Sequence, residues 1–309
     1  MRVFRSPAEV PPDFGPSAVT VGKFDGVHTG HRAVIAELER VAAAQGIASA
    51  VVTFDRNPLE VLAPEKCPES LVSVPQKLDL LAESGLDATL MLTFDRALSQ
   101  RSAEQFVKEI LVDALGAQTV MVGSDFRFGA GGGGNVAVLT TLGEKYGFAV
   151  DLIDDVRPTG GARVSSTGIR SLLADGDVGQ AARLLGHPHS VRGIVVHGAK
   201  RGRELGFPTA NLSPLLEGLI PADGVYAGWL QVGGERYAAA ISVGNNPTFE
   251  GVPQRQVEAY VIDRELDLYD RVVTVSFVEH IRGMVAFTGV DALVEQIRAD
   301  VDHARRVLG

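Results

Sequence analysis

The first half of the chain alternates between short apolar runs and longer segments whose apolar residues have helical spacing. The apolar runs, rich in β-branched residues, cover 18–21, 48–54, 89–93, 119–122 and 149–153. Short continuous apolar runs are typical of strands that are buried on both faces. Because strands and helices alternate, we expect βαβ units that build a parallel sheet, and therefore an α/β fold of the Rossmann-like type.

Two of the intervening segments carry specific helix signals. Val34, Leu38 and Val41 share one face of a helix that we expect to end at Gly46. Ser102 and Gln105 have the spacing of a capping box ahead of apolar positions 106, 110, 111 and 114. Both segments are therefore predicted to be helices packed on the sheet.

The pattern changes in the second half. Two short helical segments at 168–173 and 178–185 are followed by short strand-like runs with glycine, proline and asparagine between them. These runs cover 191–196, 226–232, 237–243, 256–262 and 272–277. We expect an antiparallel, barrel-like domain.

The domain boundary is predicted near Gly186 and Pro188, because a helix cannot continue through this pair. The predicted domains are therefore 1–185 and 186–309. The chain closes with an apolar stripe at helical spacing, for which we expect a start at Thr288 and Asp291. The stripe consists of Val290, Leu293, Val294, Ile297, Val301, Ala304 and Leu308.

Composition fits this picture and limits the kinds of partner. The 309 residues suffice for about two domains, and the net charge of −9 argues against a broad basic surface for nucleic acid or anionic membranes. The chain has no apolar run long enough for a membrane span and no signal-peptide pattern at its start, so we expect a cytoplasmic protein. The single cysteine, Cys67, has no second cysteine to pair with and is interpreted as a small buried or incidental thiol.

The first predicted strand leads directly into a segment with two histidines. It reads Gly22-Lys-Phe24-Asp25-Gly-Val-His28-Thr-Gly30-His31. Histidines three apart share one face of a first helical turn, Gly30 lets a ligand approach the backbone, and a strand-to-helix turn is where α/β sheets bind anions and nucleotides. We hypothesise that both imidazoles donate hydrogen bonds to a phosphate as charge builds on it. The alternative is a pair of histidines that only cap the helix.

A second cluster of polar residues lies at the start of the predicted helix 168–173. Arg163, Ser166, Thr167 and Arg170 bring hydroxyls and guanidinium groups to a helix N-terminus, a combination that suits a polyphosphate. Ordinary N-capping is the alternative interpretation.

Together these motifs are similar to those of a known family. GxFDGVHxGH at 22–31 and SSTxIR at 165–170, with 54–58 and 122–129 between them, resemble the adenylyltransferase domain of prokaryotic bifunctional riboflavin kinase/FMN adenylyltransferases (FAD synthetases). The second half resembles the riboflavin kinase domain of the same family in the segments 202–212, 224–228, 246–249 and 257–258. The resemblance covers nearly the whole chain.

The resemblance implies two consecutive reactions. The C-terminal barrel would phosphorylate riboflavin to FMN with ATP and Mg²⁺, and the N-terminal domain would transfer AMP from a second ATP to FMN, giving FAD and pyrophosphate. His28 and His31 are then the catalytic candidates of the second reaction. The resemblance also implies nucleotide and flavin contacts from Gly22, Phe24, Asp25, Gly30, Asp125, Arg163, Ser166, Thr167, Arg170, Gly198, Lys200, Arg203, Gly206, Pro208, Thr209 and Asn211.

The kinase residues also have a physical interpretation of their own. Thr209 and Asn211 are two apart on an extended run, so both project from one face and offer neutral oxygens to Mg²⁺. Glu258 lies in an apolar-rich strand, and the resemblance implies that it is the base that takes the proton of the riboflavin 5′-hydroxyl; a solvated strand glutamate is the alternative. The glycines 198, 202 and 206 around Lys200, Arg201 and Arg203 predict a flexible loop over phosphates, or else a mobile hairpin.

The sequence departs from the family's pattern in four places. Gly131–Gly134 stand where relatives often carry basic residues, Tyr260 stands where histidine is common, Lys23 replaces an uncharged residue, and 283–287 is less polar. We expect Asn135 to cap the helix that follows the glycine run. None of these departures removes a catalytic candidate.

Three other functions compete with this interpretation. Gly129, Gly131 and Gly134 match the GxGxxG of dinucleotide-binding oxidoreductases, with Asp151 about 20 residues on, but they follow the fourth predicted strand instead of the first. A nucleic-acid binder is disfavoured by the acidic balance, although HxGH also occurs in class I tRNA synthetases. The third is a flavin or nucleotide carrier with one or both activities lost. We expect small-molecule substrates, no nucleic acid and no membrane as partners, and leave homo-oligomerisation open.

Overall fold

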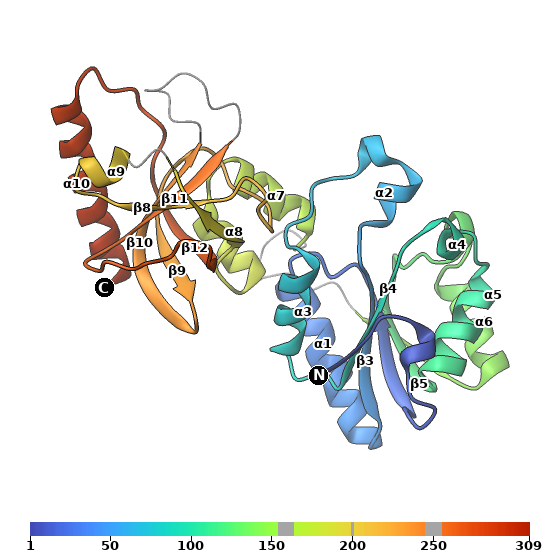
Figure 1. Ribbon diagram of the computed structural model, residues 1–309. Coiled ribbons are helices and arrows are strands. Elements are labelled where there is room, and N and C mark those ends of the chain that lie inside the picture. Colours follow the sequence, from blue (N-terminus) through green and yellow to red (C-terminus); the bar gives the residue numbers. More distant parts are fainter. Residues whose placement is uncertain (154–163, 199–200, 245–254) are drawn as a thin grey trace. The chain divides into compact units, whose positions relative to one another are not determined.

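The protein is described by a computed structural model in two compact units (Figure 1). Residues 1–153, 164–198, 201–244 and 255–309 are described. The first unit consists of Met1–Ser70 and Val74–Val164, and the second of Leu71–Ser73 and Ser165–Gly309. The sequence predicted a division near residue 185, whereas the second unit already includes α7 and α8, which precede that residue. The two helices belong to the second unit because their contacts lie there.

The described part of the first unit contains a six-stranded sheet whose neighbouring strands are all parallel. Its order is β1 (Arg2–Phe4), β4 (Ala88–Leu92), β3 (Ala48–Phe54), β2 (Ser17–Val21), β5 (Ala117–Gly123) and β6 (Ala149–Ile153). The five predicted strands and the parallel sheet are confirmed. The sequence pattern missed β1, since three residues are too few to show a period.

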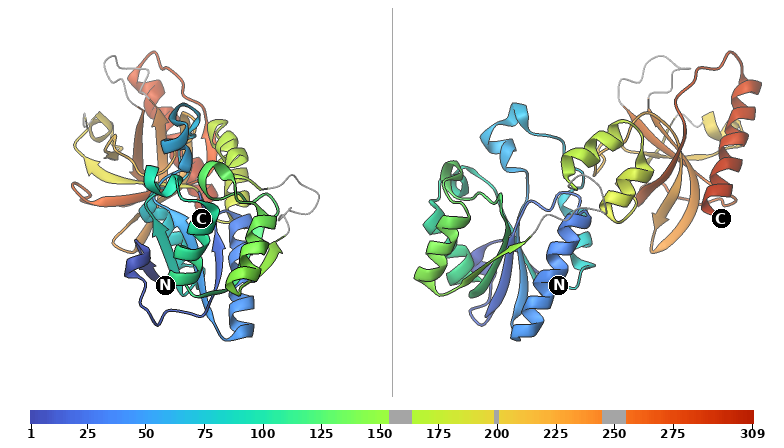
Figure 2. Two further views of the ribbon diagram at one scale, coloured as in Figure 1. Left: turned by 90° about the vertical axis from the view of Figure 1, so that its right-hand side faces the viewer. Right: turned by 180° about the vertical axis from the view of Figure 1, so that it is seen from behind.

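Helices cover both faces of this sheet (Figures 1 and 2). On one face, Ala18 and Val51 pack with Ile35 of α1 (Thr29–Gln45) and Leu81 of α3 (Val74–Ala82). On the other face, the alternate strand residues pack against α5 (Ala103–Phe106), the π-helical η3 (Val107–Ala114) and α6 (Val136–Tyr146). Short helical turns complete the unit: η1 (Pro7–Glu9), α2 (Pro58–Leu62), η2 (Pro64–Lys66), α4 (Arg96–Ser99) and η4 (Ala130–Gly132).

The predicted helix signals are borne out locally. Gly46 ends α1 in the left-handed conformation with φ of 66°. Ser102 and Gln105 form the predicted capping box at the start of α5. Asn135 caps α6 by accepting a hydrogen bond from the Val138 amide at 3.0 Å. The π-helical winding after Phe106 was not predicted, because the apolar positions fit an α-helix equally well.

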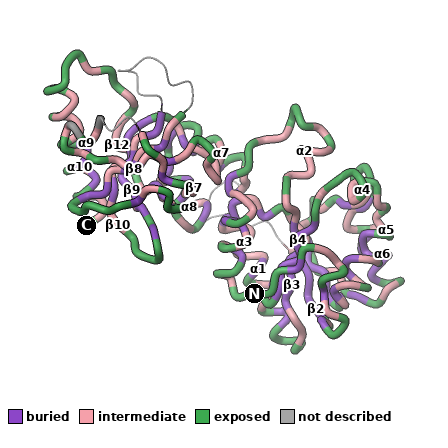
Figure 3. Tube along the Cα trace, in the orientation of Figure 1, coloured by how far each residue is buried: buried purple, intermediate pink, exposed green. Residues whose placement is uncertain are grey.

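The second unit is a closed barrel of antiparallel strands, as the sequence predicted. Helices α7 (Ser166–Ala174) and α8 (Val178–Leu185) precede it, and both agree with the predicted segments. The barrel order is β10 (Glu235–Gly244), β11 (Gln256–Val261), β8 (Thr209–Leu212), β7 (Ser190–Val196), β12 (Val272–Arg282) and β9 (Gly224–Val232). Buried residues concentrate in the strands of each unit (Figure 3).

The C-terminal helix α10 (Val290–Leu308) packs on the outside of the barrel, where Val301 and Ala304 contact Ala227 of β9. Its N-cap is Gly289, which supplies no side-chain cap, so the predicted start at Thr288 is wrong by one residue. An ion pair between Arg282 of β12 and Asp300 of α10, at 2.7 Å, fixes the helix to the barrel.

Candidate active sites

The two histidines of the HxGH motif lie where β2 leads into α1. His28 is the N-cap of α1, and its Nδ1 accepts a hydrogen bond from the backbone N–H of His31 at 3.3 Å. The two imidazole rings stack with centroids 3.7 Å apart and planes 15° from parallel. Because Nδ1 of His28 accepts, the ring proton of the neutral form lies on Nε2.

His28 is thus a helix cap, as the alternative interpretation expected, but His31 is more than that. Its Nδ1 is buried and has no hydrogen-bond partner among the described residues. Burial, followed by the charges of His28, Lys77 and Lys23, lowers the pKa of His31 well below its ordinary value. The ring is therefore neutral at pH 7 without ligand, and it keeps a buried polar atom that a bound phosphate oxygen would satisfy.

The segment before the histidines has an unusual backbone. Phe24 and Val27 have positive φ angles of 50° and 38°, and Gly26 between them has 80°. A positive φ is rare for an aromatic residue and costly for a β-branched one, so this turn is strained. Strain of this kind persists only where the surroundings hold the chain, and both Phe24 and Val27 are buried.

Two glycines in the motif make room for neighbouring rings. A Cβ at Gly22 would lie 2.9 Å from the ring of Phe24, and one at Gly30 would lie 3.2 Å from Cε1 and Nδ1 of His28. Gly30 therefore first accommodates the His28 imidazole, a close approach that the sequence interpretation had assigned to a ligand.

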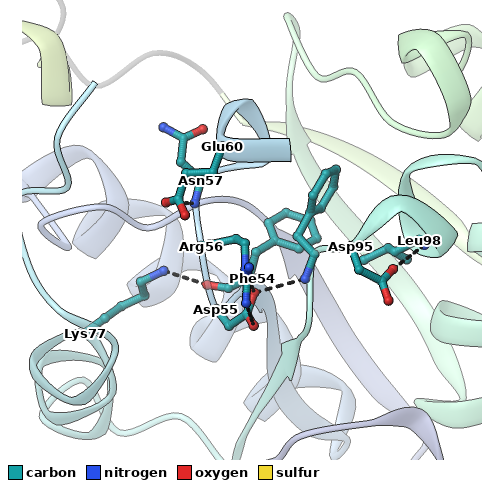
Figure 4. Close-up of polar contacts among 9 residues, drawn as sticks. Phe54, Asp55, Arg56, Asn57, Glu60, Lys77, Asp95 and Leu98 are labelled. Carbon is teal, nitrogen blue, oxygen red and sulfur yellow. Dashed lines mark hydrogen bonds and ion pairs between the residues drawn. The ribbon is translucent and has the colours of Figure 1, made fainter. Parts of the chain in front are cut away.

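Further predicted residues lie at the same edge of the sheet, because parallel strands end together. Asp25 belongs to the strained turn after β2, and Asp125 is exposed two residues after β5, which pairs with β2. Asp55 follows β3, and its carboxylate accepts hydrogen bonds from Arg56 and from the Phe94 amide (Figure 4). Burial alone would raise the pKa of Asp55, but these hydrogen bonds outweigh it and hold the pKa low.

The glycine run after β5 is a tight turn and not a dinucleotide fingerprint. Phe128 and Gly134 pair with each other, and a Cβ at Gly134 would lie 2.7 Å from the Phe128 ring. A Cβ at Gly129 would lie 2.6 Å from the Ala103 amide nitrogen. These glycines are needed for close packing against Phe128 and α5.

The second polyphosphate motif begins α7, in the second compact unit. Ser165 caps the helix by accepting from the Gly168 amide at 3.2 Å, so part of the motif does serve ordinary N-capping. Thr167 is exposed in the first turn, Ser166 and Arg170 are half-buried, and Arg163 lies outside the described residues.

The predicted kinase residues come together on the barrel. Asn211 of β8 pairs with Glu258 of β11 in register, and the Thr209 hydroxyl donates to the Glu258 carboxylate at 3.2 Å. The Asn211 side-chain NH₂ donates to the Thr209 carbonyl and hydroxyl at 3.2 and 3.3 Å. Residues of β11 alternate between buried and half-buried, and Glu258 shares the half-buried face with Tyr260, which contacts Phe207.

The glycine-rich segment before β8 folds close to this cluster. A Cβ at Gly198 would lie 2.6 Å from Cγ and Oδ1 of Asn211. Between them, α9 (Arg201–Glu204) is a single helical turn closed by hydrogen bonds from Phe207 to Gly202 and from Gly206 to Arg203. Arg203, Gly206 and Pro208 are exposed, whereas Lys200 and the 246–249 segment lie outside the described residues.

The sequence reasoning missed one polar residue of the first site. Lys77 of α3 is only 7% exposed, and its ammonium lies at the β2–β3 edge. A signal did exist, because Lys77 is one turn from the buried Leu81 and so shares the helix face that packs on the sheet.

Comparison with known proteins agrees with both halves of this picture. The FAD synthetase family model matches residues 11–168, and the riboflavin kinase family model matches residues 185–308. The bifunctional riboflavin kinase/FMN adenylyltransferase of Escherichia coli K12 is 39% identical over 94% of this chain and 92% of its own. The protein of the same name from Pseudomonas fluorescens is 38% identical over 99% and 97%.

A solved structure also matches along the whole chain. It is titled a macrolide-efflux protein from Streptococcus pneumoniae, with a TM-score of 0.86, 30% identity and 98% coverage of both chains. In this chain, none of the helices in the described ranges has the length and apolar character to cross a bilayer. The two family models match the two halves of the chain, and the curated relatives match nearly its whole length. The chain belongs to the family of bifunctional riboflavin kinases/FMN adenylyltransferases, which make FMN and FAD from riboflavin and ATP.

Proposed function

We propose that the adenylyl transfer to FMN takes place at the β2–α1 edge of the sheet, with His28 and His31 as the groups that hold the ATP phosphates. The observation that supports this most is the buried, unpartnered Nδ1 of His31 beside the stacked His28 ring.

In this reaction an oxygen of the FMN phosphate bonds to the α-phosphorus of ATP. The bond from that phosphorus to the oxygen bridging to the β-phosphate breaks, and pyrophosphate leaves. The imidazole N–H groups donate hydrogen bonds to the phosphates, and the charge of the triphosphate raises the affinity of His31 for a proton as it binds. The contribution of the site is positioning and stabilisation of developing negative charge.

The other predicted contacts of this half fit the same task. Gly22, Phe24, Asp25 and Gly30 shape the turn, and Asp125 lies two residues after the neighbouring strand β5. We assign Arg163, Ser166, Thr167 and Arg170 to the ATP phosphates, since hydroxyls and guanidinium groups suit them. The domain boundary is accordingly proposed after Leu185, so that α7 counts with the adenylyltransferase although its contacts lie in the second unit.

For the kinase we propose that Thr209 and Asn211 hold Mg²⁺ and that Glu258 is the general base. The hydroxyl, the amide oxygen and the carboxylate are oxygen ligands of the kind Mg²⁺ prefers. Hydrogen bonds from the Asn211 Nδ2 to the Thr209 hydroxyl, and from that hydroxyl to Glu258, hold the three side chains together. Mg²⁺ would neutralise charge on the ATP phosphates. Glu258 takes the proton of the riboflavin 5′-hydroxyl, whose oxygen then bonds to the γ-phosphorus as ADP leaves.

The segment 198–208 is proposed to cover the phosphates of this second site. Gly198, Lys200, Arg203, Gly206 and Pro208 belong to it, and the position of Gly198 against Asn211 supports the assignment. We further propose that this acidic protein binds no nucleic acid and works in the cytoplasm, where ATP is made.

A flavin time course tests both assignments in one chain. Purified protein is incubated with riboflavin, ATP and Mg²⁺, and the flavins are separated by chromatography. We expect FMN and then FAD from the unchanged chain. Glu258→Gln should lower FMN formation about 10²- to 10⁴-fold but still convert added FMN to FAD; His28→Ala should show the opposite pattern. Full activity of either variant would remove that residue from its role.

A further inference from the structure

A buried lysine lies at the edge of the sheet beside the histidines. The ammonium of Lys77 donates a hydrogen bond to the carbonyl of Lys23 at 3.1 Å. It donates a second one to the carbonyl of Phe54 at 2.9 Å (Figure 4). Lys23 opens the turn after β2, and Phe54 is the last residue of β3. The side chain thus links the ends of two neighbouring strands from a third element, α3.

The carbonyl of Lys23 is an anchor for the strained turn. It accepts a second hydrogen bond, from the buried hydroxyl of Thr53 at 3.1 Å. The next residue, Phe24, is the first of those with positive φ, and His28 follows four residues later. A turn with strained angles keeps its shape only if its ends are held, and Lys77 and Thr53 hold one end.

The charge of Lys77 also reaches the site. The group is buried, and desolvation lowers the pKa of Lys77 in spite of the opposing charges of Asp25 and Asp55. The same ammonium contributes to the low pKa of His31. A neutral donor would be enough to make hydrogen bonds to two carbonyls. The positive charge of a lysine at this position is therefore not required by hydrogen bonding alone.

We propose that Lys77 is a positioning residue for adenylyl transfer, which holds the strained turn so that His28 and His31 meet the ATP phosphates. This inference rests on the proposed role of the two histidines. Lys77 acts through the turn and not by contact with substrate. Its loss should therefore affect FAD formation and leave FMN formation unchanged.

A double-mutant cycle separates this role from a general structural one. Lys77→Met keeps an unbranched side chain of similar length and removes the ammonium. We expect FAD formation from added FMN to fall about 30- to 100-fold, since small displacements of catalytic groups cost about 10²-fold. In a His28→Ala/His31→Ala background the same substitution should cost less than about threefold, because both groups that Lys77 positions are already absent. Equal losses in both backgrounds would overturn the proposal.

A matched variant controls for the loss of a lysine in the same unit. Lys145→Met removes an exposed ammonium that pairs with Glu104 on the surface. Its FAD formation should stay within twofold of the unchanged chain. The riboflavin kinase rate of every variant serves as an internal measure of active protein, and a drop in that rate with Lys77→Met would also contradict the proposal.

A second variant decides the matter if Lys77→Met does not fold. Thr53→Val removes the other donor to the Lys23 carbonyl without changing charge or shape. It should lower FAD formation about three- to tenfold, and this loss should again vanish in the His28→Ala/His31→Ala background. Normal rates in Thr53→Val would show that the anchor is not needed. If His28→Ala and His31→Ala leave FAD formation intact, both the proposed site and this inference are wrong. If those two variants lose FAD formation but the Lys77 and Thr53 variants keep it, only this inference is wrong.

Discussion

Gly198→Ala offers a sharp test of the kinase site, because it adds one methyl group at a known place. The new Cβ would lie 2.6 Å from Cγ and Oδ1 of Asn211 and 2.8 Å from its Nδ2. Carbon atoms do not approach so closely, so the side chain of Asn211 must move. The φ angle of Gly198 lies outside the range that strains alanine, and the effect is therefore steric only.

The displacement has an estimable cost in stability. Moving Asn211 breaks its two hydrogen bonds to Thr209, each worth about 1 kcal/mol. Alanine in place of glycine lowers the conformational entropy of the unfolded chain, which raises the unfolding free energy by about 0.4–1 kcal/mol. The variant should therefore lose roughly 1–1.5 kcal/mol of unfolding free energy, too little to unfold a domain of ordinary stability.

The kinase rate should suffer far more than stability. A ligand displaced by about 1 Å lowers a rate roughly 10²-fold, so FMN formation from riboflavin should fall by that factor while FAD formation from added FMN stays constant. Gly283→Ala is the matched control, since a Cβ there meets nothing within 4 Å. A Gly198→Ala chain with normal FMN formation at limiting Mg²⁺ would refute the role of Asn211.

Three further predictions concern stability. Asp300→Ala leaves the Arg282 guanidinium without its carboxylate partner and should cost about 3 kcal/mol in urea unfolding, whereas Asp302→Ala, at an exposed ion pair, should cost less than about 0.5 kcal/mol. Burial lowers the pKa of His189 to about 4, so the unfolded chain binds its proton first. The unfolding free energy should then drop by up to about 3 kcal/mol between pH 6.5 and pH 4, a slope that His189→Gln should reduce. Ser102→Ala removes a helix cap and should lower stability by about 1 kcal/mol in thermal unfolding, and an unchanged midpoint would contradict this.

Most of the fold was accessible from the sequence because its signals are local. The strands of the sheet are apolar runs, Gly46 and Gly186 end helices in the left-handed conformation, and Ser102 caps one. The start of α10 was missed by one residue because Thr288 is a good N-cap type, yet the chain uses Gly289 without a side-chain cap. Propensity gives a preference, and the packing of α10 on the barrel decides the register.

The candidate sites could be predicted from the sequence where their chemistry depends on residue type. Histidine pairs and the Thr209–Asn211 spacing stand out in a sequence, and the structure places Thr209 and Asn211 beside Glu258, 49 residues from Thr209, through the pairing of β8 with β11. The backbone strain at Phe24 and Val27 has no such signal, since both residue types normally avoid positive φ.

Lys77 shows why the other residues of the site could be found only in the three-dimensional structure. Its two partners are backbone carbonyls, which every residue has, so no residue type marks them in the sequence. They become partners only because β2 and β3 pair in parallel and end at the same level, with α3 packed across that edge. A lysine on a helix face is ordinarily assigned to solvent. A buried lysine whose partners are the carbonyls at two strand ends is therefore recognisable only when the sheet order is known, and the same step should identify positioning residues in other α/β sites built at a strained strand-to-helix turn.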